Sequence, residues 1–92
     1  MTNNDIHNAV VKALTQVQEL SGRAAIKIDG NTCPIGDLEG FDSLNAVETA
    51  GIISGYIGHE VQPKTMLSSN PNKPLRVSDI VTRIFQSIND DH

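Results

Sequence analysis

Residues 40–48 of the chain read GFDSLNAVE, and in this stretch an acidic loop passes into a helix with apolar patterning. Ser43 stands at the junction. A serine nucleophile needs an adjacent base to activate it, and the sequence offers no such partner for this hydroxyl. We therefore expect another protein to modify the Ser43 hydroxyl, and we do not expect the chain to be an enzyme.

The helix that starts at Asp42 or Ser43 is predicted to end near Ile57. Its apolar positions follow helical spacing and are Leu44, Ala46, Val47, Ala50, Ile53 and Ile57. Gly51 and Gly55 each weaken a helix by about 1 kcal/mol relative to alanine, so tertiary packing has to hold it. Their spacing produces a smooth strip. That strip either accommodates packing within the bundle or admits the close approach of another helix or chain.

Two further amphipathic helices flank this one. The first is predicted over residues 4–21, with an apolar stripe of Ile6, Val10, Leu14, Val17 and Leu20. Its expected stop is Gly22, and its expected cap is one of Asn3, Asn4 and Asp5. The last helix is predicted from about Leu75, with a stripe of Val77, Ile80, Val81, Ile84, Phe85 and Ile88.

The connecting segments are less regular. Residues 25–28 alternate like a short strand and residues 32–35 could return beside them, but an isolated hairpin is marginal, so we predict an extended loop. The side chains expected to anchor this loop under the helices are Ile26, Ile28 and Ile35. Residues 64–67 suggest one helical turn, residues 68–74 a loop, and residues 89–92 a frayed tail. The prediction is an all-α, small four-helix bundle with three main helices, one short helix and a long first loop, forming one domain over residues 1–92.

The composition agrees with a small helical domain. Apolar residues make up 38% of the 92 residues and aromatic residues only 3%, so the core has to be built mainly from Ile, Val, Leu and Ala. Cys33 is the only cysteine, which excludes an intrachain disulfide and favours a reducing compartment. The sequence shows neither a signal peptide nor an apolar run of the ~20 residues that span a bilayer, so we expect a cytoplasmic monomer that does not enter the membrane. The histidines and Cys33 are scattered, so we expect no metal site.

The charge is unevenly distributed. The formal net charge is -4, and no Lys or Arg lies between Lys27 and Lys64. The acidic residues in that interval are Asp29, Asp37, Glu39, Asp42, Glu48 and Glu60. Phosphate backbones are bound by basic clusters, so nucleic acid is not an expected partner. The segment suits a protein with a basic patch, or it is a solvated acidic surface that maintains solubility.

The stretch in this context resembles the acyl carrier protein family, which includes the peptidyl carriers of modular synthases. Asp42, Ser43, Leu44, Val47 and Glu48 reproduce the family's DSLxxVE run, and GDLEGF at residues 36–41 precedes it. The resemblance covers most of the chain, because the order of helices and the long first loop also agree.

The resemblance implies that Ser43 receives a 4′-phosphopantetheine arm from coenzyme A through a phosphopantetheinyl transferase. The arm ends in a thiol that carries acyl groups as thioesters. We expect unpaired backbone N–H groups at the helix start to favour the phosphate, while Asp42 and Glu39 oppose it. Alternatively, Ser43 is an ordinary N-cap; if Asp42 caps the helix instead, the Ser43 hydroxyl is left free.

The family's docking surface follows the same helix. Leu44, Val47 and Glu48 match it, and Gly51 falls at a position of that surface that usually holds a larger apolar side chain. Its implied partners are acyl-loading and acyl-processing enzymes with basic docking patches. Some positions depart from the pattern of fatty-acid carriers, including Thr49 at an aliphatic position and residues 54–56 where an acidic cluster is usual. These departures suggest a specialised lipid, polyketide or related pathway. The alternatives are a peptidyl or aminoacyl carrier and an unmodified helical protein-interaction module.

Overall fold

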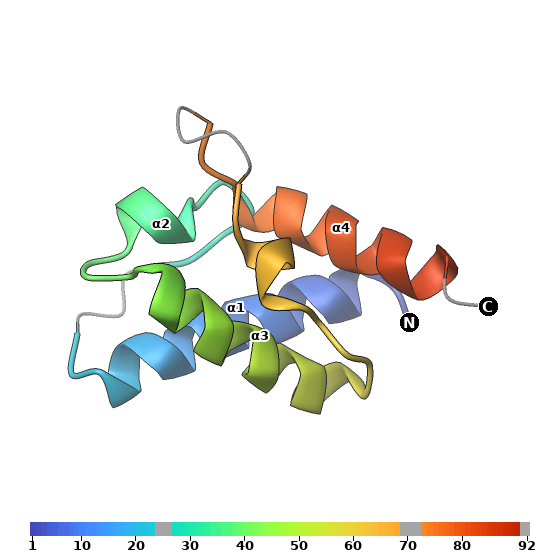
Figure 1. The fold of residues 1–92 in the computed structure, drawn as a ribbon, viewed down its shortest axis with the longest axis horizontal. Helices are drawn as coiled ribbons and strands as arrows, with labels where there is room; N and C mark the ends of the chain where they lie inside the picture. Colours follow the sequence, from blue (N-terminus) through green and yellow to red (C-terminus); the bar gives the residue numbers. More distant parts are fainter. Residues whose placement is uncertain (24–26, 69–72, 91–92) are drawn as a thin grey trace.

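The computed structural model describes residues 1–23, 27–68 and 73–90, and every regular element within them is helical (Figure 1). The elements are α1 (Asn3–Leu20), α2 (Pro34–Asp37), α3 (Ser43–Ile57), the 3₁₀ helix η1 (Pro63–Met66) and α4 (Val77–Asp90). The predicted all-α class is therefore confirmed, with three main helices and a short one before the last. In the described part of the chain, no helix is both long and apolar enough to cross a bilayer.

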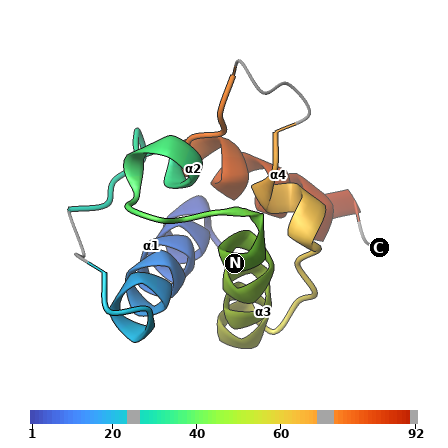
Figure 2. The same cartoon turned by 60° about the vertical axis from the view of Figure 1, so that its left-hand side comes forward.

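Helix α1 is central to the packing. It contacts both α3 and α4, and η1 lies against α3 and α4 (Figure 1, Figure 2). The largest fully buried apolar side chains come from α1, α3 and α4 and are Ile6, Leu14, Ile53, Ile80 and Ile84. Leu38 and Phe41, from the loop before α3, are also buried in this core. These two side chains thus anchor the loop that leads to Ser43 on the core.

The two ends of α1 correct two predictions. Its N-cap is Thr2, whose hydroxyl accepts a hydrogen bond from the Asp5 N–H at 3.1 Å, while the Asp5 carboxylate accepts one from the Thr2 N–H at 3.1 Å. This reciprocal pair is a capping box, which places the cap one residue before the predicted candidates. Leu20 is 74% exposed, because it lies about 120° around the helix from Leu14, outside the buried face. Gln18 takes the inward position in that last turn.

The first loop is not simply extended. Residues 34–37 form the single turn α2, in which the Asp37 N–H donates to the Cys33 carbonyl at 2.9 Å. Pro34 suits the first position of such a turn, because its missing N–H would be unpaired there anyway. Ile35 is 38% exposed and does not anchor the loop, whereas Ile28 is half-buried against the core as predicted.

The strand-like alternation at residues 25–28 can be compared with the structure only in part. Ile26 and the first half of this segment lie outside the described residues, as do residues 69–72 of the predicted loop. Residues 27 and 28 are not in a strand. The loop is held instead to the start of α4, where the Val77 and Ser78 N–H groups donate to carbonyls of the first loop at 2.8 and 3.0 Å. The fraying predicted for residues 89–92 does not begin at residue 89, because α4 continues to Asp90, and residues 91 and 92 lie outside the described residues.

Candidate functional site

Ser43 is exposed and is the first residue of α3. Asp42 is the N-cap: its Oδ1 accepts hydrogen bonds from the Leu44 N–H at 3.0 Å and the Asn45 N–H at 3.1 Å. The Asn45 Oδ1 in turn accepts from the Asp42 N–H at 3.2 Å, which completes a capping box. Among the described residues, the Ser43 hydroxyl has no hydrogen-bond partner. Asp42 therefore caps the helix and leaves the Ser43 hydroxyl free.

The same capping box corrects the expectation of unpaired N–H groups at the helix start for Leu44 and Asn45, whereas the Ser43 N–H has no partner among the described residues. The Leu44 and Asn45 N–H groups already donate to the Asp42 carboxylate. An anion attached to Ser43 would therefore find these donors engaged and the negative charge of Asp42 beside it.

The loop before Ser43 is fixed to α1 by Gln18, which the sequence analysis did not identify. This side chain is fully buried, and its Nε2 donates to the Glu39 carbonyl at 3.0 Å. Its Oε1 is also buried and has no partner among the residues that the structure describes. The available signal was a polar residue at an inward position of an otherwise apolar helix face. The hydrogen bond from Gln18 thus holds the loop at Glu39 against α1.

Arg23 is the second residue that the sequence analysis missed. Its Nη1 donates to the Asn45 Oδ1 at 3.0 Å, so the side chain reaches the first turn of α3 from just beyond the end of α1. On the way it passes directly over Gly40, which has a left-handed φ of +67°. No periodic pattern connects residues 22 positions apart, so only the folded chain brings this cation to the site.

The predicted docking residues share one exposed face of α3. Leu44 is 70% exposed and Val47 is 48% exposed, and Glu48 and Gly51 are also exposed. Their spacing of three and four residues places them along one side of a helix. The opposite side is buried and includes Thr49, whose hydroxyl donates to the Asn45 carbonyl at 2.8 Å.

The glycine strip does not accommodate packing within the bundle. A Cβ built on Gly51 or on Gly55 would meet no described atom of another part of the chain within 4 Å, and both residues are exposed. Of the two interpretations of this spacing, the packing interpretation is wrong. The strip continues the exposed face on which Leu44 and Val47 lie.

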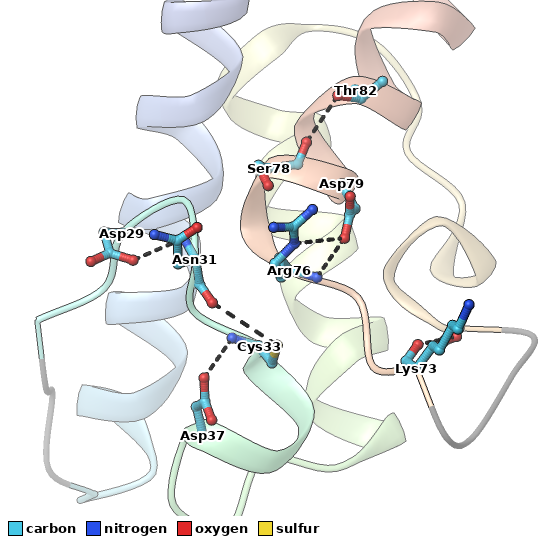
Figure 3. Close-up of polar contacts among 10 residues, drawn as sticks. Asp29, Asn31, Cys33, Asp37, Lys73, Arg76, Ser78, Asp79 and Thr82 are labelled. Atoms are coloured by element: carbon cyan, nitrogen blue, oxygen red, sulfur yellow. Dashed lines mark hydrogen bonds and ion pairs between the residues drawn. The ribbon is translucent and has the colours of Figure 1, made fainter.

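Several carboxylates of the acidic segment form local hydrogen bonds. The Asp29 carboxylate accepts from the Asn31 N–H at 2.9 Å, and the Asp37 carboxylate accepts from the Cys33 N–H at 2.8 Å (Figure 3). Burial and then the nearby Asp37 charge raise the pKa of the Cys33 thiol, which keeps it protonated and weakly nucleophilic. No group of three or more metal-ligating side chains occurs in residues 1–23, 27–68 and 73–90.

An open pocket of about 580 Å³ lies between the connection that follows α3 and helix α4. Its lining includes His59, Glu60 and Lys64. It adjoins Gly58, at the end of α3 opposite to Ser43, so it does not belong to the Ser43 site.

No protein-family model matches the chain, and the searches of curated proteins and of solved structures likewise gave no match. A functional assignment therefore depends on the residues and geometry described above.

Proposed function

We propose that this chain is an acyl carrier protein that is modified on Ser43 with 4′-phosphopantetheine and catalyses nothing itself. The observation that supports this proposal best is the exposed Ser43 hydroxyl, which has no hydrogen-bond partner among the described residues because Asp42 caps α3. A capping hydroxyl would have to break its hydrogen bond before it could be modified. The Ser43 hydroxyl does not.

The modification requires little from this chain. The Ser43 oxygen attacks the phosphorus of coenzyme A that bears the pantetheine, which forms a new P–O bond. The pyrophosphate P–O bond breaks and releases adenosine 3′,5′-bisphosphate, and the hydroxyl proton passes to a base of the transferase. The thiol of the attached arm would then hold acyl groups as thioesters. The exposed Leu44, Val47 and Glu48 support docking of enzymes with apolar and basic surfaces around this serine.

The test is incubation with coenzyme A and a broad-specificity phosphopantetheinyl transferase, followed by intact-mass measurement. The wild type is expected to gain one arm, and Ser43→Ala is expected to gain none. The control is Ser87→Ala, which removes an exposed hydroxyl on α4 and should be modified as the wild type is. Circular dichroism should show that Ser43→Ala is folded. Failure of several competent transferases to modify the wild type would overturn the proposal.

The second candidate function is an unmodified helical interaction module. The exposure of Leu44 and Val47 favours it, because large apolar side chains on an exposed helix face mark a surface that binds a partner. In that case Ser43→Ala would bind the partner as the wild type does, whereas Leu44→Asp would not.

A further inference from the structure

Arg23 lies close to the residue that bears the proposed arm. Its Nη1 and the Asp42 N–H donate to the same oxygen, the Asn45 Oδ1, at 3.0 and 3.2 Å. Asp42 is followed directly by Ser43. The guanidinium is therefore a neighbour of the peptide unit that presents the Ser43 hydroxyl.

The route of the Arg23 side chain depends on Gly40. A Cβ on this residue would lie 2.7 Å from the Arg23 Nε and 2.8 Å from its Cζ, which is closer than real Cβ contacts allow. Only glycine gives the guanidinium this room, and only glycine adopts a φ of +67° without strain. The GF pair that opens the GFDSLNAVE stretch thus serves two purposes: Phe41 anchors the loop, and Gly40 admits Arg23.

A cation close to Ser43 would offset the negative charge around a phosphodiester on this residue. Asp42 and the exposed Glu39 add negative charge to the loop before α3, and the first-turn N–H groups of Leu44 and Asn45 already donate to Asp42. Within the described residues Arg23 forms no ion pair. Its side chain donates to a neutral amide oxygen, and a guanidinium has five N–H donors in all, so donors remain for an anion.

We infer that Arg23 is the phosphate-binding residue of this carrier: its guanidinium donates hydrogen bonds to the phosphodiester that joins the arm to Ser43. This inference rests on the proposed function. Guanidinium–phosphate pairs are charge-assisted and often bidentate, which makes them stronger than neutral hydrogen bonds. The competing interpretation is that Arg23 only fastens the end of α1 to α3 through Asn45.

The two interpretations differ in what the arm does to stability. The unfolding free energy should be measured by urea titration for the unmodified and modified forms of the wild type and Arg23→Gln. If Arg23 binds the phosphate, Arg23→Gln destabilises the modified form more than the unmodified form, by roughly tenfold in the unfolding equilibrium constant. A fastening role predicts equal losses in the two forms. Equal losses would overturn the inference.

The matched control is Arg83→Gln. Arg83, on α4, is also half-buried and also donates to an uncharged oxygen, the carbonyl at 3.1 Å of Leu67, the residue that follows η1. The loss of unfolding free energy in Arg83→Gln should be the same with and without the arm.

Phosphorus-31 NMR of the modified proteins gives a readout that does not depend on stability. The phosphodiester resonance should shift between wild type and Arg23→Gln and should not shift in Arg83→Gln. If Arg23→Gln does not fold, Arg23→Lys keeps the charge but loses the planar fork, and its resonance should also shift. An unchanged resonance in the Arg23 variants would overturn the inference while leaving the proposed function intact. If the wild type never gains the arm in the mass measurement, both proposals fail.

Discussion

At the scale of single residues, the site depends on Asp42, and not Ser43, being the N-cap of α3. The aspartate satisfies two N–H groups of the first turn of α3, so the serine beside it is not needed for capping. Sequence reasoning could identify this as one of two alternatives, because either side chain can cap a helix. It could not identify the partners of Gln18 and Arg23, since Glu39 and Asn45 become their neighbours only when the chain folds.

The role of Gly40 can be tested against a glycine of the same conformation. Gly40 and Gly58 have φ values of +67° and +68°, but only at Gly40 would a Cβ collide with another side chain. Both Gly40→Ala and Gly58→Ala should lose about 1–2 kcal/mol of unfolding free energy through left-handed strain. Gly40→Ala should lose about 1 kcal/mol more, because Arg23 must leave Asn45.

Urea titration measures both losses, and the Gly40→Ala loss should be repeated in an Arg23→Ala background. The additional loss should disappear there, since no arginine remains to be displaced. Equal losses for the two glycines in the wild-type background would show that the Arg23 contact contributes nothing to stability.

At the scale of elements, the long apolar stripes identified the three main helices, because apolar residues at this spacing over more than three turns are typical of a helix with one buried face. The turn α2 could not be predicted in this way, since four residues contain no repeat. Its Ile35 and Gly36 also depart from helical dihedral angles, so it is irregular even within one turn. The Leu20 error has a related cause: a stripe read as a spacing of three or four drifts off the buried face by the last turn of a helix with about 3.6 residues per turn.

The open glycines of α3 predict a gain in stability. Gly51→Ala and Gly55→Ala should each raise the unfolding free energy by about 1 kcal/mol, because alanine favours the helix and the added Cβ meets no described atom. Thermal unfolding should show the two gains adding in the double variant. The matched control is Ala46→Gly, which should lose more than this amount because Ala46 is fully buried. A loss of stability at Gly51 would show that the strip is packed in the molecule.

The carboxylates in the first turns of α1 and α4 predict how the stability of the protein changes at acidic pH. Hydrogen bonds from the backbone and hydroxyl of Thr2 lower the pKa of Asp5, and bonds from the backbone and side chain of Arg76 lower the pKa of Asp79 (Figure 3). A carboxyl whose pKa is lower in the folded state stabilises the fold above its unfolded pKa of about 3.9 and loses this contribution as pH falls through the folded value. Unfolding free energy measured from about pH 6 to about pH 2 should therefore fall on the acid side, and Asp5→Asn should fall less steeply.

The control for the acid titration is Glu19→Gln. Glu19 is on the same helix as Asp5 and is exposed, and its carboxylate accepts no hydrogen bond from the part of the chain that the structure describes. The unfolding free energy of Glu19→Gln should fall with decreasing pH as that of the wild type does. An Asp5→Asn curve parallel to that of the wild type would contradict the capping explanation.

At the scale of the whole molecule, the dominant feature is excess negative charge. The formal net charge is -4, and a single ion pair, between Arg76 and Asp79 at 3.4 Å, occurs among the described residues. That pair is exposed, and such pairs contribute little. Most carboxylates therefore repel one another without local compensation. The same field would attract a basic partner toward the Ser43 face.

This repulsion predicts that salt stabilises the protein. Raising the NaCl concentration from about 10 mM to about 1 M shortens the Debye length from ~30 Å to ~3 Å, which screens the carboxylates from one another. The urea midpoint should rise with salt in the wild type. The double variant Glu39→Gln/Glu60→Gln removes two exposed negative charges and should respond less, whereas Lys27→Gln removes an exposed positive charge and should respond more. A midpoint that falls with salt would mean that attractive interactions outweigh the repulsion between carboxylates. The acidic segment would then stabilise the fold.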